Sequence, residues 1–441
     1  MALIKKITAR EILDSRGVPT IEGRLETQDG IVVTAQVPSG ESLGAHEGIE
    51  LRDGDMDRYA GQGVLTAVSY IQNALGTKLV GVNTQLQAEI DAWLLKADGT
   101  PQYKRLGVNT LMVISQLVLK ASAIEARMEL YEYVNKMYNA TYNSPRPLAI
   151  IPSPIYNMIN GGKHGTKNLD FQEFQLVPST SMDFSKTLHI AVSIYDGLKD
   201  LFEERNANVS VSDEGGFTPN LFTNMEAFDI IKEVLMVKKL KLGVDMYLGA
   251  DCVAEHYYAN GRYAIKDQAA ALTIEEYMKF LIETVGTYNM LILEDPLSEE
   301  DFTSWQKITL ELGKQTFIVG DDFIAGSTER LKRAAEKHAC NAVLVKFNQV
   351  ATISEMLRFV ASVHDADMKI VMSHRMGETT DSTIADIGVG IQADFVKFGS
   401  PARGERIAKY NRLLEIEQDM KDKKSLQPTG PTPENPPIQT L

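Results

Sequence analysis

The sequence predicts an α/β protein in which a small N-terminal α+β domain precedes a (β/α)8-like barrel. Apolar and polar residues alternate over positions 1–37, which is typical of antiparallel strands. Between positions 63 and 138 the apolar spacing becomes helical. Farther along, short apolar runs alternate with amphipathic helical stretches, and this repeated pattern predicts a parallel sheet closed into a barrel.

The first 138 residues carry the α+β pattern. The stretch "TIEGRLETQDGIVVTAQVP" alternates around a turn at Asp29 and Gly30 and predicts an antiparallel meander. The Gly-rich segment "VPSGESLGAHEG" follows, and we expect a mobile loop there. Helical spacing then runs through "VLTAVSYIQNAL", "QLQAEIDAWLL" and "LMVISQLVLKASAIEA".

The prolines of "NSPRPLAIIPSP" indicate a domain boundary. We therefore expect an N-terminal α+β domain at residues 1–138 and a barrel at residues 139–420. Stretches such as "TIEEYMKFLIETV" and "ISEMLRFVASVH" would supply the barrel helices. The Pro-rich residues 421–441 are expected to form a disordered tail.

Composition excludes several function classes. The net charge of −14 argues against a nucleic-acid partner, because phosphate backbones require clustered Lys and Arg. A small anionic substrate stays possible, since a bound metal can invert the local charge. The cysteines, Cys252 and Cys340, lie in apolar segments and are expected to be buried thiols. We expect no membrane span and no signal peptide, and hence a cytoplasmic protein.

The ends of the apolar runs carry the chemistry. Each run closes on a charged residue or an imidazole: Asp251, Glu294, Asp321, Lys346, His374 and Lys397. From Glu294 onward the spacings are 27, 25, 28 and 23 residues, the length of one βα unit. A single charge at a strand end is usually only solvated, but six in succession are not plausibly accidental. In a barrel they would meet at one rim, where such enzymes keep their active sites.

Three carboxylates at one rim need a neutralising cation. With oxygen ligands only, Mg²⁺ fits better than zinc. A Lys beside this cation and a second Lys should have a lowered pKa and could act as a base. The combination suits abstraction of a proton next to a carboxylate, with the metal stabilising the charge that develops.

From about Ile7 to Glu417 the chain closely resembles the enolase family, the phosphopyruvate hydratases. Eleven motifs in family order carry the resemblance: "AREILDSRG", "VPSGES", "ELRDGD", "NGGKHG", "FQEF", "DEGGFTPN", "LEDPL", "VGDD", "KFNQ", "SHRMGETTD" and "GERIAKYNRLLEIE". The resemblance implies an enolase-type barrel whose small domain supplies a lid. It also implies a homodimer or a larger even homo-oligomer.

The resemblance implies a metal site and an acid–base pair. Asp251, Glu294 and Asp321 match the ligands of a tightly held Mg²⁺. Ser39 matches the ligand that brings in a second Mg²⁺ when the lid closes. Lys346 matches the general base that takes the Cα proton of 2-phosphoglycerate. The acid that helps hydroxide leave would be Glu214, and Glu173 would be hydrogen-bonded nearby.

Substrate contacts are implied as well. His164 resembles a residue that holds substrate, and Lys397 would pair with the substrate carboxylate. Arg375 would grip the phosphate with two charge-assisted hydrogen bonds. The remaining positions of the expected substrate site are Gln172, Ser373, His374 and Met376.

Some positions depart from the family pattern. Met376 stands where most relatives have a Ser that touches phosphate. Losing that hydroxyl contact should cost about 0.5–1.5 kcal/mol, and the alternative is that Met376 turns into an apolar gap. Further departures occur at Val18, Glu41, Leu43, Thr218 and His256. Phe347 and Phe398 follow the two lysines and should point away from the pocket, because strand residues alternate direction.

Three functions compete. The leading one is an active enolase, which interconverts 2-phospho-D-glycerate and phosphoenolpyruvate in glycolysis and gluconeogenesis. The second is a relative that acts on an altered phospho- or phosphono-acid, suggested by Leu43 and Met376. The third is an inactive scaffold. It is disfavoured because none of the three acids or the two lysines is missing.

Overall fold

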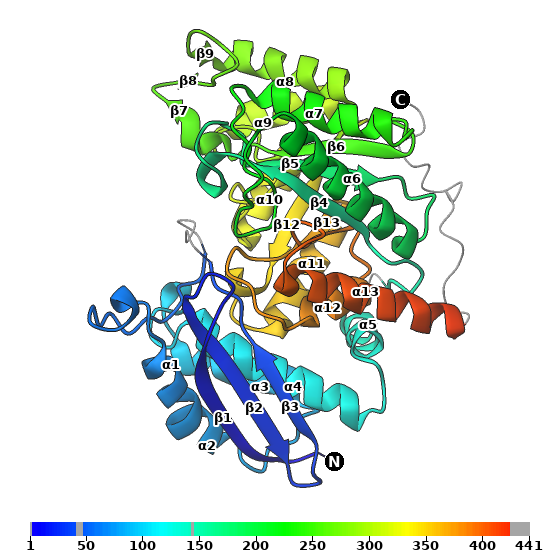
Figure 1. The fold of residues 1–441 in the computed structure, drawn as a ribbon. Coiled ribbons are helices and arrows are strands. Elements are labelled where there is room, and N and C mark those ends of the chain that lie inside the picture. The colour runs from blue at the N-terminus through cyan, green and yellow to red at the C-terminus, as the bar shows by residue number, and fades with distance from the viewer. Residues whose placement is uncertain (1, 41–46, 143–144, 424–441) are drawn as a thin grey trace.

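The computed structural model describes residues 2–40, 47–142 and 145–423. An N-terminal α+β unit, blue to cyan in Figure 1, lies beside a larger barrel unit, green to red. The predicted tail falls mostly at positions 424–441, outside the described residues, as do Glu41, Leu43 and His46.

The N-terminal sheet is the predicted antiparallel meander. Its order is β1 (Ile4–Leu13), β2 (Pro19–Thr27) and β3 (Val32–Gln36). The β2–β3 turn is closed by the Thr27 amide, which donates to the Ile31 carbonyl at 2.9 Å. Alternate residues of β2, including Ile21 and Leu25, are fully buried, as the period of two predicts.

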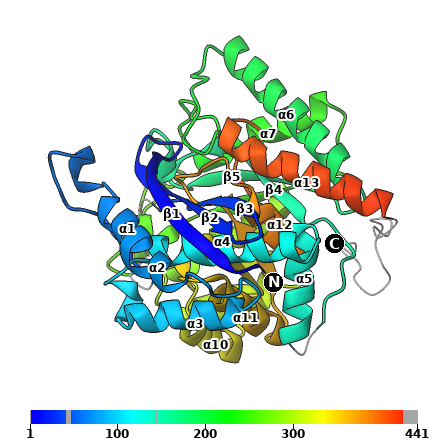
Figure 2. The same ribbon diagram turned by 90° about the horizontal axis from the view of Figure 1, so that it is seen from below.

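Helices complete the N-terminal unit. They are α1 (Leu65–Ser69), which continues through a π-helical stretch (Tyr70–Leu75) into α2 (Gly76–Lys78), then α3 (Gln87–Asp98), α4 (Val108–Glu125) and α5 (Leu130–Thr141). Seen from below in Figure 2, the sheet lies over α4. Helix α4 is long and apolar enough to cross a membrane, but 83% of it is buried inside the protein, as expected of a core helix.

Eight strands close the barrel. In chain order they are β4 (Ser153–Asn160), β5 (Glu173–Pro178), β6 (Met246–Asp251), β10 (Met290–Glu294), β11 (Phe317–Gly320), β12 (Ala342–Lys346), β13 (Lys369–Ser373) and β14 (Phe395–Lys397). Around the ring they follow the order β10-β11-β12-β13-β14-β4-β5-β6. Neighbours pair in parallel except at β5, which is antiparallel to both β4 and β6.

The antiparallel β5 corrects the expectation of a wholly parallel sheet. Residues 161–172 join β4 to β5 and contain only one short 3-10 turn, with no long crossover helix. Because a parallel neighbour needs such a crossover, the strand after a short connection must run back. The end of β4 at Asn160 and the beginning of β5 at Glu173 therefore share one mouth of the barrel.

Within residues 145–423, eight α-helices belong to the barrel unit: α6 (Phe184–Glu204), α7 (Asn224–Val237), α8 (Ile274–Tyr288), α9 (Phe302–Leu312), α10 (Thr328–Lys337), α11 (Ile353–Asp365), α12 (Thr383–Gly390) and α13 (Gly404–Asp422). Several begin at a side-chain cap, as at Thr273, whose hydroxyl accepts the Glu276 amide. A small sheet of β7 (Tyr258–Ala259), β8 (Arg262–Tyr263) and β9 (Leu272–Thr273) precedes α8.

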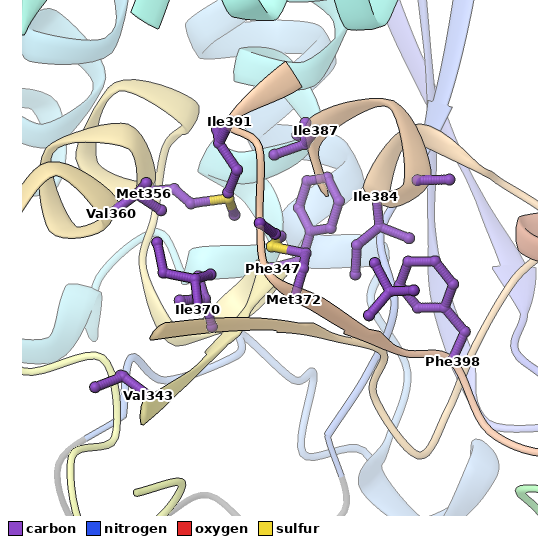
Figure 3. Close-up of a cluster of buried hydrophobic side chains, with 14 of the residues drawn as sticks. Val343, Phe347, Met356, Val360, Ile370, Met372, Ile384, Ile387, Ile391 and Phe398 are labelled. Atoms are coloured by element: carbon purple, nitrogen blue, oxygen red, sulfur yellow. The ribbon is translucent and has the colours of Figure 1, made fainter. Parts of the chain in front are cut away.

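Apolar residues between the strands and the helices fix the direction of the rim side chains. Figure 3 shows Phe347 and Phe398 in a buried cluster with Met372 and Ile384. Phe347 is 3% exposed and Phe398 is fully buried. Both rings point into the layer behind the strands, as predicted, so the lysines before them project toward the barrel mouth.

The N-terminal unit contacts the loops that follow the barrel strands. The backbones of Ser39 and Gly377 pair in an antiparallel bridge. Lys120 of α4 forms an ion pair with Asp381 at 2.7 Å. These contacts hold the N-terminal unit against the mouth where the charged strand ends lie.

Candidate active site

Charged residues from successive strands gather at this mouth. Asp251, Glu294, Lys346 and Lys397 are the last residues of their strands, and Asp321 and His374 follow theirs directly. Glu173, the first residue of the antiparallel β5, pairs in register with Asp251. The structure therefore places the acids and bases of the sequence motifs around one opening.

A cavity of about 260 Å³ occupies this opening. Most of the predicted site residues line it: His164, Gln172, Glu173, Glu214, Asp251, Asp321, Lys346, Ser373, His374, Arg375, Met376 and Lys397. Glu294 is fully buried beneath the lining. Ser39 is not part of the lining.

The two lysines are ion-paired with the rim carboxylates. Nζ of Lys346 lies 2.5 Å from Oδ2 of Asp321. Nζ of Lys397 lies 3.1 Å from Glu173, 3.2 Å from Asp251 and 2.8 Å from Glu294. Lys346, the predicted base, thus lies directly beside one member of the acidic trio.

The expected low pKa of Lys346 is not found in this structure. Burial favours the neutral amine, but the charge of Asp321 outweighs burial and raises the pKa. The pKa of Lys397 is likewise raised, against burial, by Asp251, Glu173 and Glu294. The predicted lowering depends on a cation bound by the carboxylates and stays a prediction for that state, because here the two ammonium groups themselves neutralise the carboxylates.

A second acidic cluster lies on the β4–β5 side. Nδ1 of His164 lies 3.1 Å from Oε2 of Glu214. A ring nitrogen of His164 and one carboxylate oxygen from each of Glu173 and Glu214 lie within 4.8 Å of one another. Asn157 and Asn160 also donate to Glu214, at 3.2 and 3.3 Å.

The two carboxyl groups of this cluster, Glu173 and Glu214, have pKa values shifted in opposite directions. Burial raises the pKa of Glu173 to about 7, although Lys397 opposes this. Burial also works to raise the pKa of Glu214, but the charge of His164 and its hydrogen bond overcome burial and lower that pKa. Two carboxyl groups in one pocket with separated pKa values can hold one proton between them at neutral pH.

His374 has a defined tautomer. Nη1 of Arg406 donates to Nδ1 of His374 at 2.6 Å, and an arginine cannot accept. The ring proton therefore belongs on Nε2, which lies 3.6 Å from Oε1 of Glu214. Burial, together with the charge of Arg406, lowers the pKa of His374 and keeps it neutral.

Comparison with known proteins decides the family. The family model "Enolase, C-terminal TIM barrel domain" matches residues 148–429, and "Enolase, N-terminal domain" matches residues 4–134. A curated enolase from Acidothermus cellulolyticus is 41% identical over 422 residues, which cover 96% of each chain. The chain belongs to the enolase family. It is therefore an enzyme, a lyase of the phosphopyruvate hydratase class with a small-molecule substrate.

The enolase family is magnesium-dependent, and the carboxylates at the rim fit a hard divalent cation. Oδ1 of Asp251 is buried and has no hydrogen-bond partner within the described residues. An orphaned carboxylate oxygen is costly unless a cation or a donor satisfies it. Asp251, Glu294 and Asp321 offer oxygen atoms only, the ligand type that Mg²⁺ prefers.

Sequence reasoning missed one acid beside the trio. Asp295 is 4% exposed, and its carboxylate accepts the amides of Asp321 and Asp322 at 2.9 and 2.8 Å. It thereby fixes the turn that presents Asp321. The adjacent pair of acids in "LEDPL" was the available signal, because strand residues alternate direction and two neighbours cannot both face the cavity.

Sequence reasoning also missed residues that hold the substrate-site side chains. Glu47 pairs with Arg375, and Arg406 donates to the carbonyls of Arg375 and Met376. Arg406 is fully buried in α13. A charged residue among the apolar positions of a helix was the available signal for it.

The structure does not bring Ser39 to the cavity. Its hydroxyl donates to Oδ2 of Asp14 at 2.5 Å and accepts from Arg16 at 3.1 Å. The residue is 1% exposed. Ser39 thus anchors the N-terminal unit beside Gly377, and the expectation of a metal-binding hydroxyl at this position finds no support in the geometry.

Among the described residues, two of the departures from the family pattern line the cavity. Met376 does so, and thus does not turn into a separate apolar gap. His256 also lines it, and burial with the nearby Lys163 lowers its pKa to about 4. Thr218 instead donates to the Ser210 carbonyl at 3.1 Å, and Val18 donates its amide to Asp14 at 2.9 Å. These two have structural roles.

Proposed function

We propose that the chain catalyses the reversible dehydration of 2-phospho-D-glycerate to phosphoenolpyruvate, with Lys346 as the base and the Glu173–Glu214 pair as the acid. One observation carries this proposal. In the ring of eight strands, β12 and β5 are four places apart, so Lys346 and Glu173 face each other across the mouth. A substrate between them has a base on one side and a proton source on the other.

Lys346 would take the proton from Cα. For this its ammonium must first lose a proton, and its contact with Asp321 must loosen. Asp251, Glu294 and Asp321 would hold Mg²⁺, which stabilises the negative charge that develops on the substrate carboxylate. In this structure the same carboxylate oxygens pair with lysines. A lysine ammonium group and Mg²⁺ are both cations, and either can neutralise the negative charge of these carboxylates.

Arg375 and Lys397 would orient the substrate. The guanidinium of Arg375 suits the phosphate, and the ammonium of Lys397 suits the carboxylate. Gln172, Ser373, His374 and Met376 complete the walls of the cavity. Fixed at both ends, the substrate would present its Cα hydrogen to Lys346.

The leaving hydroxyl would depart on the β4–β5 side. Glu173, with a pKa near 7, can hold a proton there at neutral pH. Glu214, ionised beside His164, can relay that proton toward the hydroxyl. His164 lines the same side of the cavity and would lie near that hydroxyl.

An absorbance assay tests the proposal. Conversion of 2-phosphoglycerate should raise the ultraviolet absorbance at millimolar Mg²⁺, because phosphoenolpyruvate is conjugated. Excess EDTA should abolish the signal, and added Mg²⁺ should restore it. No signal at any Mg²⁺ concentration would refute the proposal.

Met376 favours one alternative, in which the enzyme carries out the same class of reaction on a substrate other than 2-phosphoglycerate. Its thioether lines the cavity where a hydroxyl would otherwise contact phosphate, which suits a phospho- or phosphono-acid with an apolar substituent. Comparing kcat/KM for 2-phosphoglycerate and for such analogues decides between the two. Met376→Ser should shift the ratio toward 2-phosphoglycerate by about two- to ten-fold.

The assembly and the location are also proposals. We propose a homodimer or larger even homo-oligomer in the cytoplasm, as family membership suggests. A second Mg²⁺, delivered with lid closure, belongs to the same expectation. Sedimentation analysis of the full chain measures the assembly state directly.

A further inference from the structure

Glu47 and Arg375 form a buried, two-pronged ion pair at the cavity wall. Nη1 of Arg375 donates to Oε1 of Glu47 at 3.1 Å, and Nη2 donates to Oε2 at 2.9 Å. The Arg375 side chain is 5% exposed and that of Glu47 is 1% exposed. Parallel hydrogen bonds of this kind fix both the position and the plane of a guanidinium.

The two halves of Arg375 are held by different parts of the protein. Its amide donates to Glu378 at 2.9 Å, and its carbonyl accepts from Arg406 at 2.8 Å, so the barrel unit holds the backbone. The guanidinium instead rests on the N-terminal unit. A Cβ at Gly40 would lie 2.1 Å from Nη2, so the guanidinium packs directly against the Gly40 backbone.

Glu47 is itself fixed in place. Nε2 of Gln349, just beyond β12, donates to its Oε1 at 3.0 Å. Burial opposes ionisation, but the charges of Arg375 and Lys346 prevail and lower the pKa of Glu47 to about 2. The residue is therefore a carboxylate at any pH at which the enzyme works.

The pair leaves Arg375 able to bind an anion. A guanidinium has five N–H donors, and the contact with Glu47 uses two. Donors among the remaining three can meet a phosphoryl group while the ion pair stays intact. The plane set by Glu47 decides where those donors point.

We propose that Glu47 is a positioning residue that aims the Arg375 guanidinium at the phosphoryl group of the substrate, and so links the N-terminal unit to substrate binding. This inference rests on the proposed function, because it takes Arg375 as the phosphate ligand. The role belongs to a residue of the smaller unit, outside the barrel strands that supply the acids and bases.

The test compares Glu47→Gln with Glu47→Asp. Glutamine keeps the shape but turns an N–H donor toward a guanidinium donor, which should push Arg375 out of its plane. We expect KM for 2-phosphoglycerate to rise about ten-fold or more, with a much smaller change in kcat. The inhibition constant of inorganic phosphate, measured as a competitive inhibitor, should rise by a similar factor. Glu47→Asp, which keeps the charge, should recover part of the loss.

A double variant asks whether Glu47 acts through Arg375. In an Arg375→Lys background, adding Glu47→Gln should change KM by less than about two-fold, because the positioned group is already gone. Fully additive effects would overturn the inference. So would a fall in KM for Glu47→Gln, which is the result expected if Glu47 merely opposed the incoming anion.

Glu50→Gln is the matched control. Glu50 is a buried carboxylate on the same segment, but it accepts from the Gly40 amide at 2.9 Å and from Asn348 at 2.5 Å. We expect this variant to lower Tm without the ten-fold rise in KM. Equal KM changes in the two variants would mean that Glu47 has only a structural role.

Arg375→Lys alone separates this inference from the proposed function. If KM for 2-phosphoglycerate does not change in that variant, Arg375 is not the phosphate ligand and the proposed function loses that assignment. If KM rises there but not in Glu47→Gln, only the positioning role of Glu47 is overturned.

Discussion

Glu173 lies in register beside Asp251, although one residue begins its strand and the other ends its strand. The antiparallel direction of β5 is what makes this possible. A carboxyl group with a raised pKa thus stands next to one of the proposed metal ligands, and Lys397 contacts both. Neighbouring strands thus set a carboxyl group that can be protonated beside the proposed cation ligands.

The proposed acid, Glu214, can be tested in a variant that leaves the proposed base, Lys346, in place. In Glu214→Gln, dehydration of 2-phosphoglycerate should fall by about a hundred-fold or more, because the relay to the hydroxyl is broken. Exchange of the Cα proton with deuterated water should continue, because Lys346 is untouched. NMR measures the exchange, and its loss in parallel with dehydration would place Glu214 in the base half instead.

The base is tested by Lys346→Met, which keeps the length of the side chain and removes the amine. Both dehydration and Cα exchange should fall by about a hundred-fold or more. Lys369→Met is the matched control, since Lys369 begins β13 at the other end of the barrel and pairs with Asp394 at 2.9 Å. Exchange that persisted in Lys346→Met would contradict the assignment.

Much of this site could be predicted from the ends of apolar runs. The identity of the strand-end residues follows from local sequence, because a buried strand that ends in a charge must place that charge at a mouth of the barrel. The reversed direction of β5 could not be found this way. It depends on the lack of a long crossover helix between Asn160 and Glu173, and the residues at the strand ends carry no information about the connections between strands.

The partners of the charged groups were also beyond local sequence. Glu47 and Arg375 are separated by 328 residues, and no period or spacing relates them. The raised pKa of Lys346 likewise follows from its 2.5 Å contact with Asp321, a distance set by the packing of two adjacent strands. Such long-range pairs are a property of the whole folded chain, including the packing of the N-terminal unit on the barrel.

Magnesium binding has a readout that does not need catalysis. A cation that binds the folded protein only should raise Tm, by an amount equivalent to about 2.7 kcal/mol at one hundred times its Kd. In Asp251→Asn this stabilisation should be strongly reduced, because an orphaned carboxylate oxygen is replaced by a neutral amide. Calcium should substitute in part, whereas sodium at equal ionic strength should not. Equal Mg²⁺ shifts in parent and variant would argue against Asp251 as a ligand.

Acid stability should depend on His364, which lies far from the charged mouth. Its Nδ1 lies 2.8 Å from the Tyr138 hydroxyl, and its Nε2 is buried without a hydrogen-bond partner within the described residues. Burial, helped by the charge of Arg146, lowers its pKa from 6.5 to about 4.

The sign of the effect follows from proton uptake. Between pH 6.5 and about 4 the unfolded chain binds a proton at His364 and the folded chain does not, so stability is full above pH 6.5 and falls as the pH drops. The difference corresponds to at most about 3 kcal/mol. Denaturant unfolding of His364→Gln should show a flatter loss of stability across this range. His189→Gln, on the exposed face of α6, should retain the slope of the parent. If the stability of His364→Gln fell with pH as steeply as that of the parent, the loss would have to come from another titrating group. That result would overturn the role given to His364.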